Sequence, residues 1–314
     1  MRFFILSILI ILNIFAKEIT PYRYVTASDA VSDFVKVENT LVIGTEEGII
    51  DIYDLEKDKT VDKIILEKQT NILGEEMGIL IMSVDYLDGK IAFLTRRLNT
   101  WGDFYIYENK KLVKLIDNSE HITLQKLAFI DKNLVIISTM GNELMLYDIQ
   151  NKKFIYKKQL NLASFSDFVL SEDKKHIFTS DETPLIYKIE ITSGKIIKEY
   201  KEANKRDIFS VDYKNNLLLS GGKDKRVILY KTPTTYKMTK ADFFVYTVAL
   251  NPKATKAAYD KNEENDISIM DTKTLKELYL LKGHNQTTVK IDFFKEDELI
   301  SADEDNKLMF WKLK

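Results

Sequence analysis

Histidine, cysteine and paired carboxylates are the residues that most often carry chemistry, and this chain has few of them in useful spacings. The three histidines, His121, His176 and His284, lie far apart in the sequence and form no short His-x-x-x-His spacing of the kind that metal sites use. The chain has no cysteine, which excludes a thiol nucleophile and a thiolate metal site. No metal or cofactor site is predicted, and His121 and His176 are interpreted as turn or surface residues.

Adjacent glutamates occur at residues 46–47, 75–76 and 263–264. Paired carboxylates can do acid–base work, but neighbours on a loop are usually only solvated. Two glycine-containing stretches, GTEEG at 44–48 and SGGKDK at 220–225, fall in predicted hairpin turns and not between a strand and a helix, so they do not predict phosphate binding. There is also no Gly-x-Ser-x-Gly nucleophile elbow. The sequence therefore predicts a protein that is not an enzyme.

The composition is that of a globular protein with a large core. The chain has 314 residues, of which 45% are hydrophobic and 30% charged, and its formal net charge is −2. Sequence-independent binding to nucleic acid needs clustered lysine and arginine, and no such cluster stands out. No nucleic-acid partner is predicted.

The first residues, MRFFILSILIILNIFA, have the layout of a secretory signal peptide. One positive charge at Arg2 precedes an apolar run from Phe3 to Ala16, which is shorter than the roughly 20 residues of a spanning helix. We therefore expect a signal peptide at 1–16, a single mature domain at 17–314 without a membrane span, and a periplasmic location. The alternative is that the run is retained as a short membrane anchor. A lipid anchor would need a cysteine.

A repeat runs along the rest of the chain at intervals of about 40 residues, with a longer first interval. Its clearest marks are the following strand ends: Tyr53-Asp54, Tyr107-Glu108, Tyr147-Asp148, Ile189-Glu190, Tyr230-Lys231, Met270-Asp271 and Trp311-Lys312. Each unit also carries earlier strand-like runs with partial apolar alternation and many β-branched and aromatic residues. The pattern predicts an all-β protein, a seven-bladed β-propeller with four antiparallel strands in each blade.

The stretches Ser220–Tyr230 and Gly283–Trp311 resemble the WD40-repeat family. The second has Gly-His at its start, Ser301 on its second strand and Asp305 in the tight turn before Trp311. The resemblance implies that His284, Ser301, Asp305 and Trp311 form a hydrogen-bonded chain that holds the blade together. Other units keep only parts of this pattern, because Tyr230 stands in place of the tryptophan and no Gly-His precedes it.

The last repeat ends one strand short. The run from Glu18 to Thr26 is strand-like and precedes the first complete unit, so it is expected to pair with LMFWK at 308–312 and close the ring. In WD40 propellers the N-terminal strand does this, and Pro21 is tolerated on an outermost strand.

Two insertions break the repeat, one at residues 67–78 and the other at residues 96–103. Links from an outer strand to the next inner strand lie on the same face of a propeller as the turns between second and third strands, so the two insertions are expected side by side. They define a candidate partner-binding rim made of Ile72, Leu73, Met77, Arg96, Arg97, Leu98 and Trp101. Tryptophan and arginine are enriched at interface hot spots. Two alternatives are that Trp101 packs down to hold its loop, and that Glu75 and Glu76 pair with the arginines.

These observations favour a monomeric, exported scaffold that binds another protein. The length, the signal peptide, the lack of cysteine and the poorly conforming repeats are together similar to the L-type accessory proteins of periplasmic nitrate reductase systems. That resemblance implies a helper in maturation or activity of the enzyme, with its catalytic subunit as partner. The alternatives are a propeller enzyme of the lactonase or dehydrogenase type, and a scaffold for envelope assembly.

Overall fold

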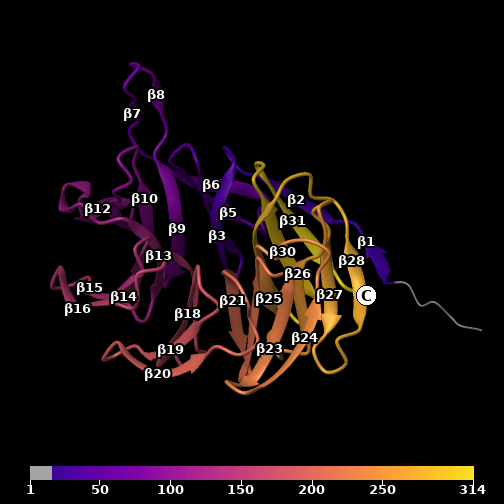
Figure 1. The fold of residues 1–314 in the computed structure, drawn as a ribbon. Helices are drawn as coiled ribbons and strands as arrows, with labels where there is room; N and C mark the ends of the chain where they lie inside the picture. Colours follow the sequence, from indigo (N-terminus) through magenta and orange to yellow (C-terminus); the bar gives the residue numbers. More distant parts are fainter. Residues whose placement is uncertain (1–15) are drawn as a thin grey trace, which may run out of the picture.

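The computed structural model describes residues 16–314, which form a ring of seven β-sheet blades (Figure 1). Apart from Ala16, the predicted signal peptide lies outside the described residues. The predicted all-β, seven-bladed propeller is confirmed.

The first four blades each use four consecutive strands that run from the channel outwards. Blade one comprises β3 (Val31–Val37), β4 (Thr40–Thr45), β5 (Ile49–Asp54) and β6 (Lys59–Ile65). Blade two comprises β9 (Leu80–Leu87), β10 (Lys90–Arg96), β11 (Phe104–Glu108) and β12 (Lys111–Ile116). Blade three comprises β13 (Leu124–Phe129), β14 (Leu134–Thr139), β15 (Glu143–Asp148) and β16 (Lys153–Gln159). Blade four comprises β17 (Phe165–Leu170), β18 (His176–Asp181), β19 (Ile186–Glu190) and β20 (Lys195–Tyr200).

The last three blades follow the same order, and two of them receive strands from the N-terminal end of the described chain. Blade five comprises β21 (Ile208–Lys214), β22 (Leu217–Gly222), β23 (Arg226–Thr232) and β24 (Thr235–Lys240). Blade six comprises β25 (Val248–Leu250), β26 (Lys256–Asp260), β27 (Ile267–Asp271), β28 (Glu277–Leu281) and β1 (Lys17–Ile19). Blade seven comprises β29 (Thr288–Lys295), β30 (Glu298–Asp303), β31 (Lys307–Lys312) and β2 (Arg23–Thr26).

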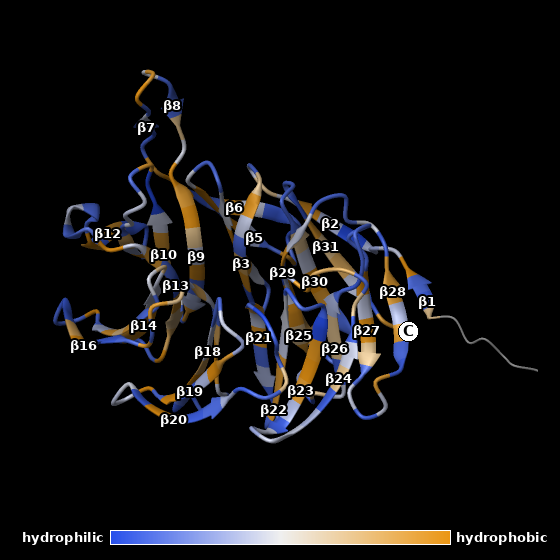
Figure 2. Ribbon diagram, in the orientation of Figure 1, coloured by the Kyte–Doolittle hydropathy of each residue, from blue (hydrophilic) through white to orange (hydrophobic). Residues whose placement is uncertain are grey.

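The core lies between neighbouring blades, because each sheet buries side chains on both of its faces. Val42 and Ile50 of blade one, for example, pack with Ile81, Val84 and Phe93 of blade two in one cluster. Second strands such as β4 and β14 are almost wholly buried, whereas outer strands such as β6 and β16 alternate between exposed and partly buried positions. Figure 2 shows the apolar segments concentrated in the blades.

The ring is closed by β2, which pairs antiparallel with β31 in the register Arg23 to Phe310. This confirms the predicted closure for residues 23–26 and corrects it for residues 18–19. Strand β1 instead runs parallel to β28 as a fifth strand of blade six. Pro21 lies at the crossing between the two blades and has no amide hydrogen to donate, so the ladder with β31 begins only at the amide of Tyr22, 2.9 Å from the Phe310 carbonyl.

The one helical element among residues 16–314 is a single 3₁₀ turn, η1 (Asn118–Glu120), in the link between blades two and three. No helix in this described part is both long and apolar enough to cross a membrane.

Candidate interaction surface

The first insertion is a short hairpin of β7 (Gln69–Thr70) and β8 (Glu76–Met77) that stands clear of the ring (Figure 1). Its turn is fixed by Asn71, whose Oδ1 accepts hydrogen bonds from the amides of Leu73 (2.9 Å) and Glu75 (3.0 Å). The amide of Gly74 donates to the Asn71 carbonyl at 3.0 Å, and Gly74 has a φ of +84°, a left-handed conformation that suits glycine. The tip is therefore an ordered turn.

The two insertions lie side by side, as expected from their places in the repeat. The amide of Leu98 donates to the Gln69 side chain at 3.0 Å and so joins the second insertion to the foot of the hairpin. Gly78 fixes the other side of that foot, because any side chain there would overlap the backbone of Glu47 in the β4–β5 turn. Residues of blades one and two thus form one continuous rim.

Arg97 is held inside this rim by a buried carboxylate, Asp103. The Arg97 Nε lies 2.9 Å from Asp103 Oδ2, and Lys114 Nζ lies 3.0 Å from Oδ1. Burial would raise the pKa of Asp103, but Lys114, the backbone amide of Asn118 and Arg97 together hold it below its ordinary value. The arginine is paired internally, with Asp103 and with neither Glu75 nor Glu76.

Arg96 and Trp101 are also engaged within the chain. The Arg96 guanidinium donates to the side chain of Gln125 in blade three. The Trp101 ring lies over the ring of His121 with centroids 3.8 Å apart, so the tryptophan packs down and holds its loop. His121 itself adopts a left-handed φ of 58° at the end of η1. These contacts match the alternative in which the tryptophan is structural.

The aliphatic members of the predicted rim remain free. Ile72 and Leu73, at the tip of the hairpin, are 102% and 77% exposed, and Leu98 and Met77 are 49% and 40% exposed. Figure 2 shows this tip as a hydrophobic point at the end of a projecting, mostly polar hairpin. Hence the part of the rim that is available to a partner is aliphatic.

The structure joins three of the four residues of the predicted polar chain in blade seven. Ser301 Oγ accepts a hydrogen bond from Trp311 Nε1 at 2.7 Å and lies 2.6 Å from His284 Nε2. The fourth position needs correction, because the other ring nitrogen of His284 lies 3.0 Å from Asp303. Asp305 is exposed, and its carboxylate accepts only from the amide of Asn306. Asp303 ends a buried strand, whereas Asp305 lies in the turn beyond it.

Blade five has a chain of the same kind that the sequence did not reveal. Asn204 Oδ1 accepts from Ser220 Oγ at 3.2 Å, and its Nδ2 donates to the Tyr230 hydroxyl at 2.9 Å. Asparagine therefore stands where blade seven has histidine, and tyrosine where it has tryptophan. The Ser220 and Tyr230 positions were visible in the repeat, but Asn204 lies in a link with no Gly-His signal.

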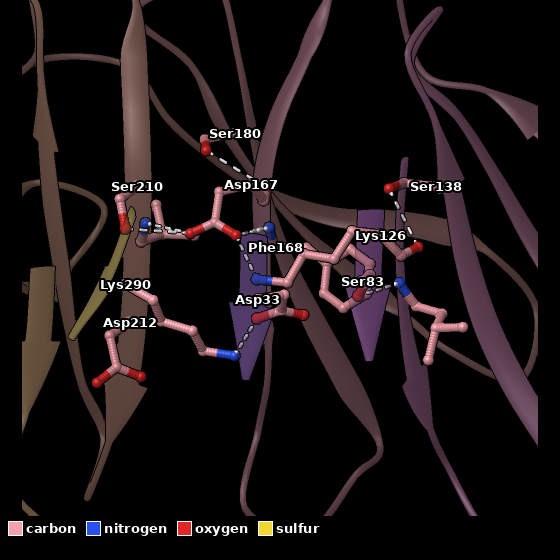
Figure 3. A network of polar contacts seen from close by, with 12 residues as sticks. Asp33, Ser83, Lys126, Ser138, Asp167, Phe168, Ser180, Ser210, Asp212 and Lys290 are labelled. Atoms are coloured by element: carbon pink, nitrogen blue, oxygen red, sulfur yellow. Dashed lines mark hydrogen bonds and ion pairs between the residues drawn. The ribbon is translucent and has the colours of Figure 1, made fainter. Parts of the chain in front are cut away.

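The central channel contains a cavity of about 490 Å³ whose polar side chains connect neighbouring inner strands (Figure 3). Asp33 accepts from the amide of Val84 at 2.8 Å and lies 2.7 Å from Lys290 Nζ. Asp167 in turn accepts from the amide of Val211 at 3.0 Å and pairs with Lys126 at 2.5 Å. These carboxylates link one blade to the next, which gives them a structural role.

A second group of carboxylates lines the channel, two residues further along the inner strands than the repeat position of Asp33 and Asp167. Asp85 accepts from the amide of Phe129 at 2.7 Å and Asp212 from that of Leu250 at 2.6 Å. Burial raises the pKa of both, and it raises the pKa of Asp292 to about 6. Within residues 16–314, no three His, Asp or Glu side chains gather in a group that could hold a metal ion.

An aromatic cluster at the channel mouth was also missed from the sequence. Phe209 stacks on Tyr246 with centroids 5.4 Å apart, and Phe243 and Phe244 lie beside them in the link between blades five and six. The signal was the run DFFVY at 242–246, which is unusual among otherwise polar links. The remaining histidine, His176, is half-buried in β18, and burial lowers its pKa.

The blades, the ring closure by the N-terminal strand and the His–Ser–Trp chain define a WD40-like seven-bladed β-propeller. The β-propeller domain of Cps50 (Swd1) from Myceliophteria thermophila has the same fold, with a TM-score of 0.74 over 94% of this chain and 99% of that domain. Its sequence is only 12% identical, so the similarity concerns the fold alone.

Two curated proteins are similar in sequence over part of the chain. They are the COP1 E3 ubiquitin-protein ligases of Arabidopsis thaliana and Pisum sativum, each 26% identical over 148 and 147 residues respectively. The matched segment is 45% of this chain and 22% of each relative. The chain thus spans less than a quarter of the length of the curated relatives it matches. No protein-family model matches the chain.

Proposed function

We propose that this protein is an exported, non-enzymatic scaffold that binds another protein through the rim of blades one and two. The observation that carries the proposal is the hairpin tip, where Ile72 and Leu73 are exposed on an ordered turn that projects from a rigid ring. Ordered loops on rigid scaffolds often carry function, and exposed aliphatic side chains supply binding free energy when a partner covers them.

The more specific proposal is that the partner is the catalytic subunit of a periplasmic nitrate reductase. The support is the similarity in length, N-terminal run, lack of cysteine and divergent repeats noted above. In this role the propeller assists maturation or activity of the enzyme and carries out no chemistry of its own.

Export is tested by fractionating cells and sequencing the N-terminus of the protein. We expect a mature chain that begins at Lys17 in the periplasmic fraction. An intact Met1 on protein extracted from the membrane would contradict export with cleavage and support the retained anchor.

Binding is tested by cross-linking intact cells and recovering the full chain with an antibody. We expect one protein to be recovered reproducibly at a constant molar ratio to the propeller. Under the specific proposal, that protein is the nitrate reductase catalytic subunit. Its absence from a reproducible complex would reject the specific partner but leave the scaffold. Recovery of the propeller alone would reject the scaffold.

A further inference from the structure

We propose that the β7–β8 hairpin is an insertion finger whose tip, Ile72 and Leu73, enters an apolar pocket bordered by basic side chains on a folded partner protein. The proposal rests on the scaffold function above and specifies how the partner is recognised.

The shape of the tip argues for a concave partner. Ile72 is 102% exposed and Leu73 is 77% exposed, and both lie at the turn of a hairpin that projects beyond the neighbouring links (Figure 1). A flat surface can cover only one side of such a convex point, whereas a pocket can remove most of the apolar surface from water. The turn is already ordered by Asn71, so little conformational entropy remains to be lost on binding.

The charge around the tip argues for a basic border. Glu67, Glu75 and Glu76 lie exposed on the hairpin, and Glu46 and Glu47 occupy the adjacent β4–β5 turn. Among the ion pairs of residues 16–314, none involves these five glutamates.

The nearby basic side chains do little to offset this acidity. Lys68 is the one base within residues 67–78, and Arg97 is neutralised by Asp103. Arg96 donates to the uncharged side chain of Gln125 and keeps its charge, but it lies at the end of β10 below the hairpin. An apolar tip with Glu75 and Glu76 beside it and further carboxylates at the foot of the hairpin is complementary to an apolar pocket bordered by lysine or arginine.

The same charges argue against insertion into a lipid bilayer. Two exposed aliphatic residues at a loop tip could enter a membrane, but Glu75 and Glu76 beside them, and the carboxylates at the foot of the hairpin, would be repelled by anionic headgroups. A membrane is therefore the alternative that the experiment has to exclude.

The chain supplies a matched control at Leu162. This residue is 97% exposed in the link between β16 and β17, which lies on the same face of the ring. Its link spans only Leu160–Ser164 and forms no hairpin. Leu162 thus reproduces the exposure of the tip without its projection.

The test places the photo-cross-linker p-benzoylphenylalanine in the full chain, in the cells that make the protein. It is placed at position 72, at the control position 162, or at position 246 in the aromatic cluster of the channel mouth. We expect a strong adduct from position 72, joined to a partner segment with apolar side chains and neighbouring lysine or arginine, and no adduct from 162. Adducts from 246 or 162 without one from 72 would overturn the finger and leave the scaffold. The absence of adducts at all three positions would overturn both.

Affinity and lipid binding complete the test with purified proteins. The double variant Ile72→Ser/Leu73→Ser should weaken the isolated complex at least about tenfold, whereas Leu162→Ser should leave it unchanged. Glu75→Gln/Glu76→Gln should slow association and reduce its salt dependence. Equal affinity of the serine double variant and the wild type, or Ile72-dependent sedimentation of the propeller with phosphatidylglycerol vesicles, would overturn the proposal.

Discussion

The two insertions on the rim lie against each other, yet one is tied into the ring and the other is free. The β10–β11 turn at residues 97–103 holds Arg97 on the buried Asp103 and Trp101 on His121. The hairpin at 69–77 touches the ring at its foot but presents Ile72 to solvent. Residue type alone suggests the reverse assignment, because arginine and tryptophan are enriched at hot spots.

The difference shows that availability decides which side chains can bind a partner. A guanidinium that already neutralises a buried carboxylate cannot leave it without exposing that charge to an apolar surrounding. An aliphatic side chain on a projecting turn has no internal partner to lose. Four changes test this contrast, and they are ordered by the size of the effect expected.

Arg97→Ala should lower the free energy of unfolding by about 2–3 kcal/mol, because buried Asp103 loses one of its two cationic partners. The affinity of the folded protein for its partner should not change. Urea unfolding and titration of the complex measure the two quantities. A loss of affinity of about 2 kcal/mol at unchanged stability would instead make Arg97 a contact residue.

The pH dependence of the same variant gives a second check. The native pKa of Asp103 is depressed, so the stability from its ion pairs is fully present above the unfolded pKa of about 3.9 and is lost as the pH falls through the native value. The stability difference between wild type and Arg97→Ala should therefore be constant near neutral pH and shrink below about pH 4. A difference that persists at low pH would point to lost packing.

Trimming the hairpin to the length of the Leu160–Ser164 link should have the opposite effect to Arg97→Ala, with weaker binding at nearly unchanged stability. No tip side chain is buried, so the melting temperature should change little, while the complex should weaken by about 2 kcal/mol as hot-spot residues are removed. Calorimetry on the trimmed chain and on the isolated complex measures both. Unchanged affinity would show that the partner binds elsewhere.

Trp101→Ala should reduce stability by about 1–2 kcal/mol through loss of the contact with His121. Partner affinity should stay the same. Thermal unfolding measures the first and the titration the second. Trp101→Phe is the control, since it keeps an aromatic face over the imidazole and should recover part of the stability.

Asn71→Ala should have the smallest effect, a few-fold loss of affinity at unchanged stability. The alanine removes the acceptor that orders the amides of Leu73 and Glu75, so the tip must be ordered during binding. Asn71→Asp keeps an acceptor oxygen and should bind nearly as well as the wild type. If Asn71→Ala binds as tightly as the wild type, preorganisation of the tip contributes nothing.

Most of the fold could be predicted from the sequence because it repeats. Seven runs of buried strands at a nearly constant interval require seven similar sheets, and a terminal unit short of one strand requires a strand from elsewhere. The path of residues 17–19 could not be predicted in this way. Three residues carry no pattern, and their place beside β28 depends on the free outer edge of blade six.

The hydrogen-bonded chain of blade seven could also be predicted only in part. His284, Ser301 and Trp311 could be placed because their spacing follows the repeat. The choice between Asp303 and Asp305 could not, since the two lie only two positions apart, on either side of the end of β30. That choice depends on which carboxylate the strand directs inward to the imidazole.

The sequence by itself determined the blade count, the closure of the ring and the presence of two neighbouring insertions, because strand periodicity and repeat spacing are local properties of the chain. Only the tertiary structure decided that the arginines and Trp101 face inward and that Ile72 and Leu73 remain free. Two of the partners of the inward side chains, Gln125 and His121, lie in other strands and links, and Asp103 is oriented by Lys114 and Asn118 beyond the turn that it shares with Arg97. A side chain's availability depends on such partners, and packing alone brings them within reach.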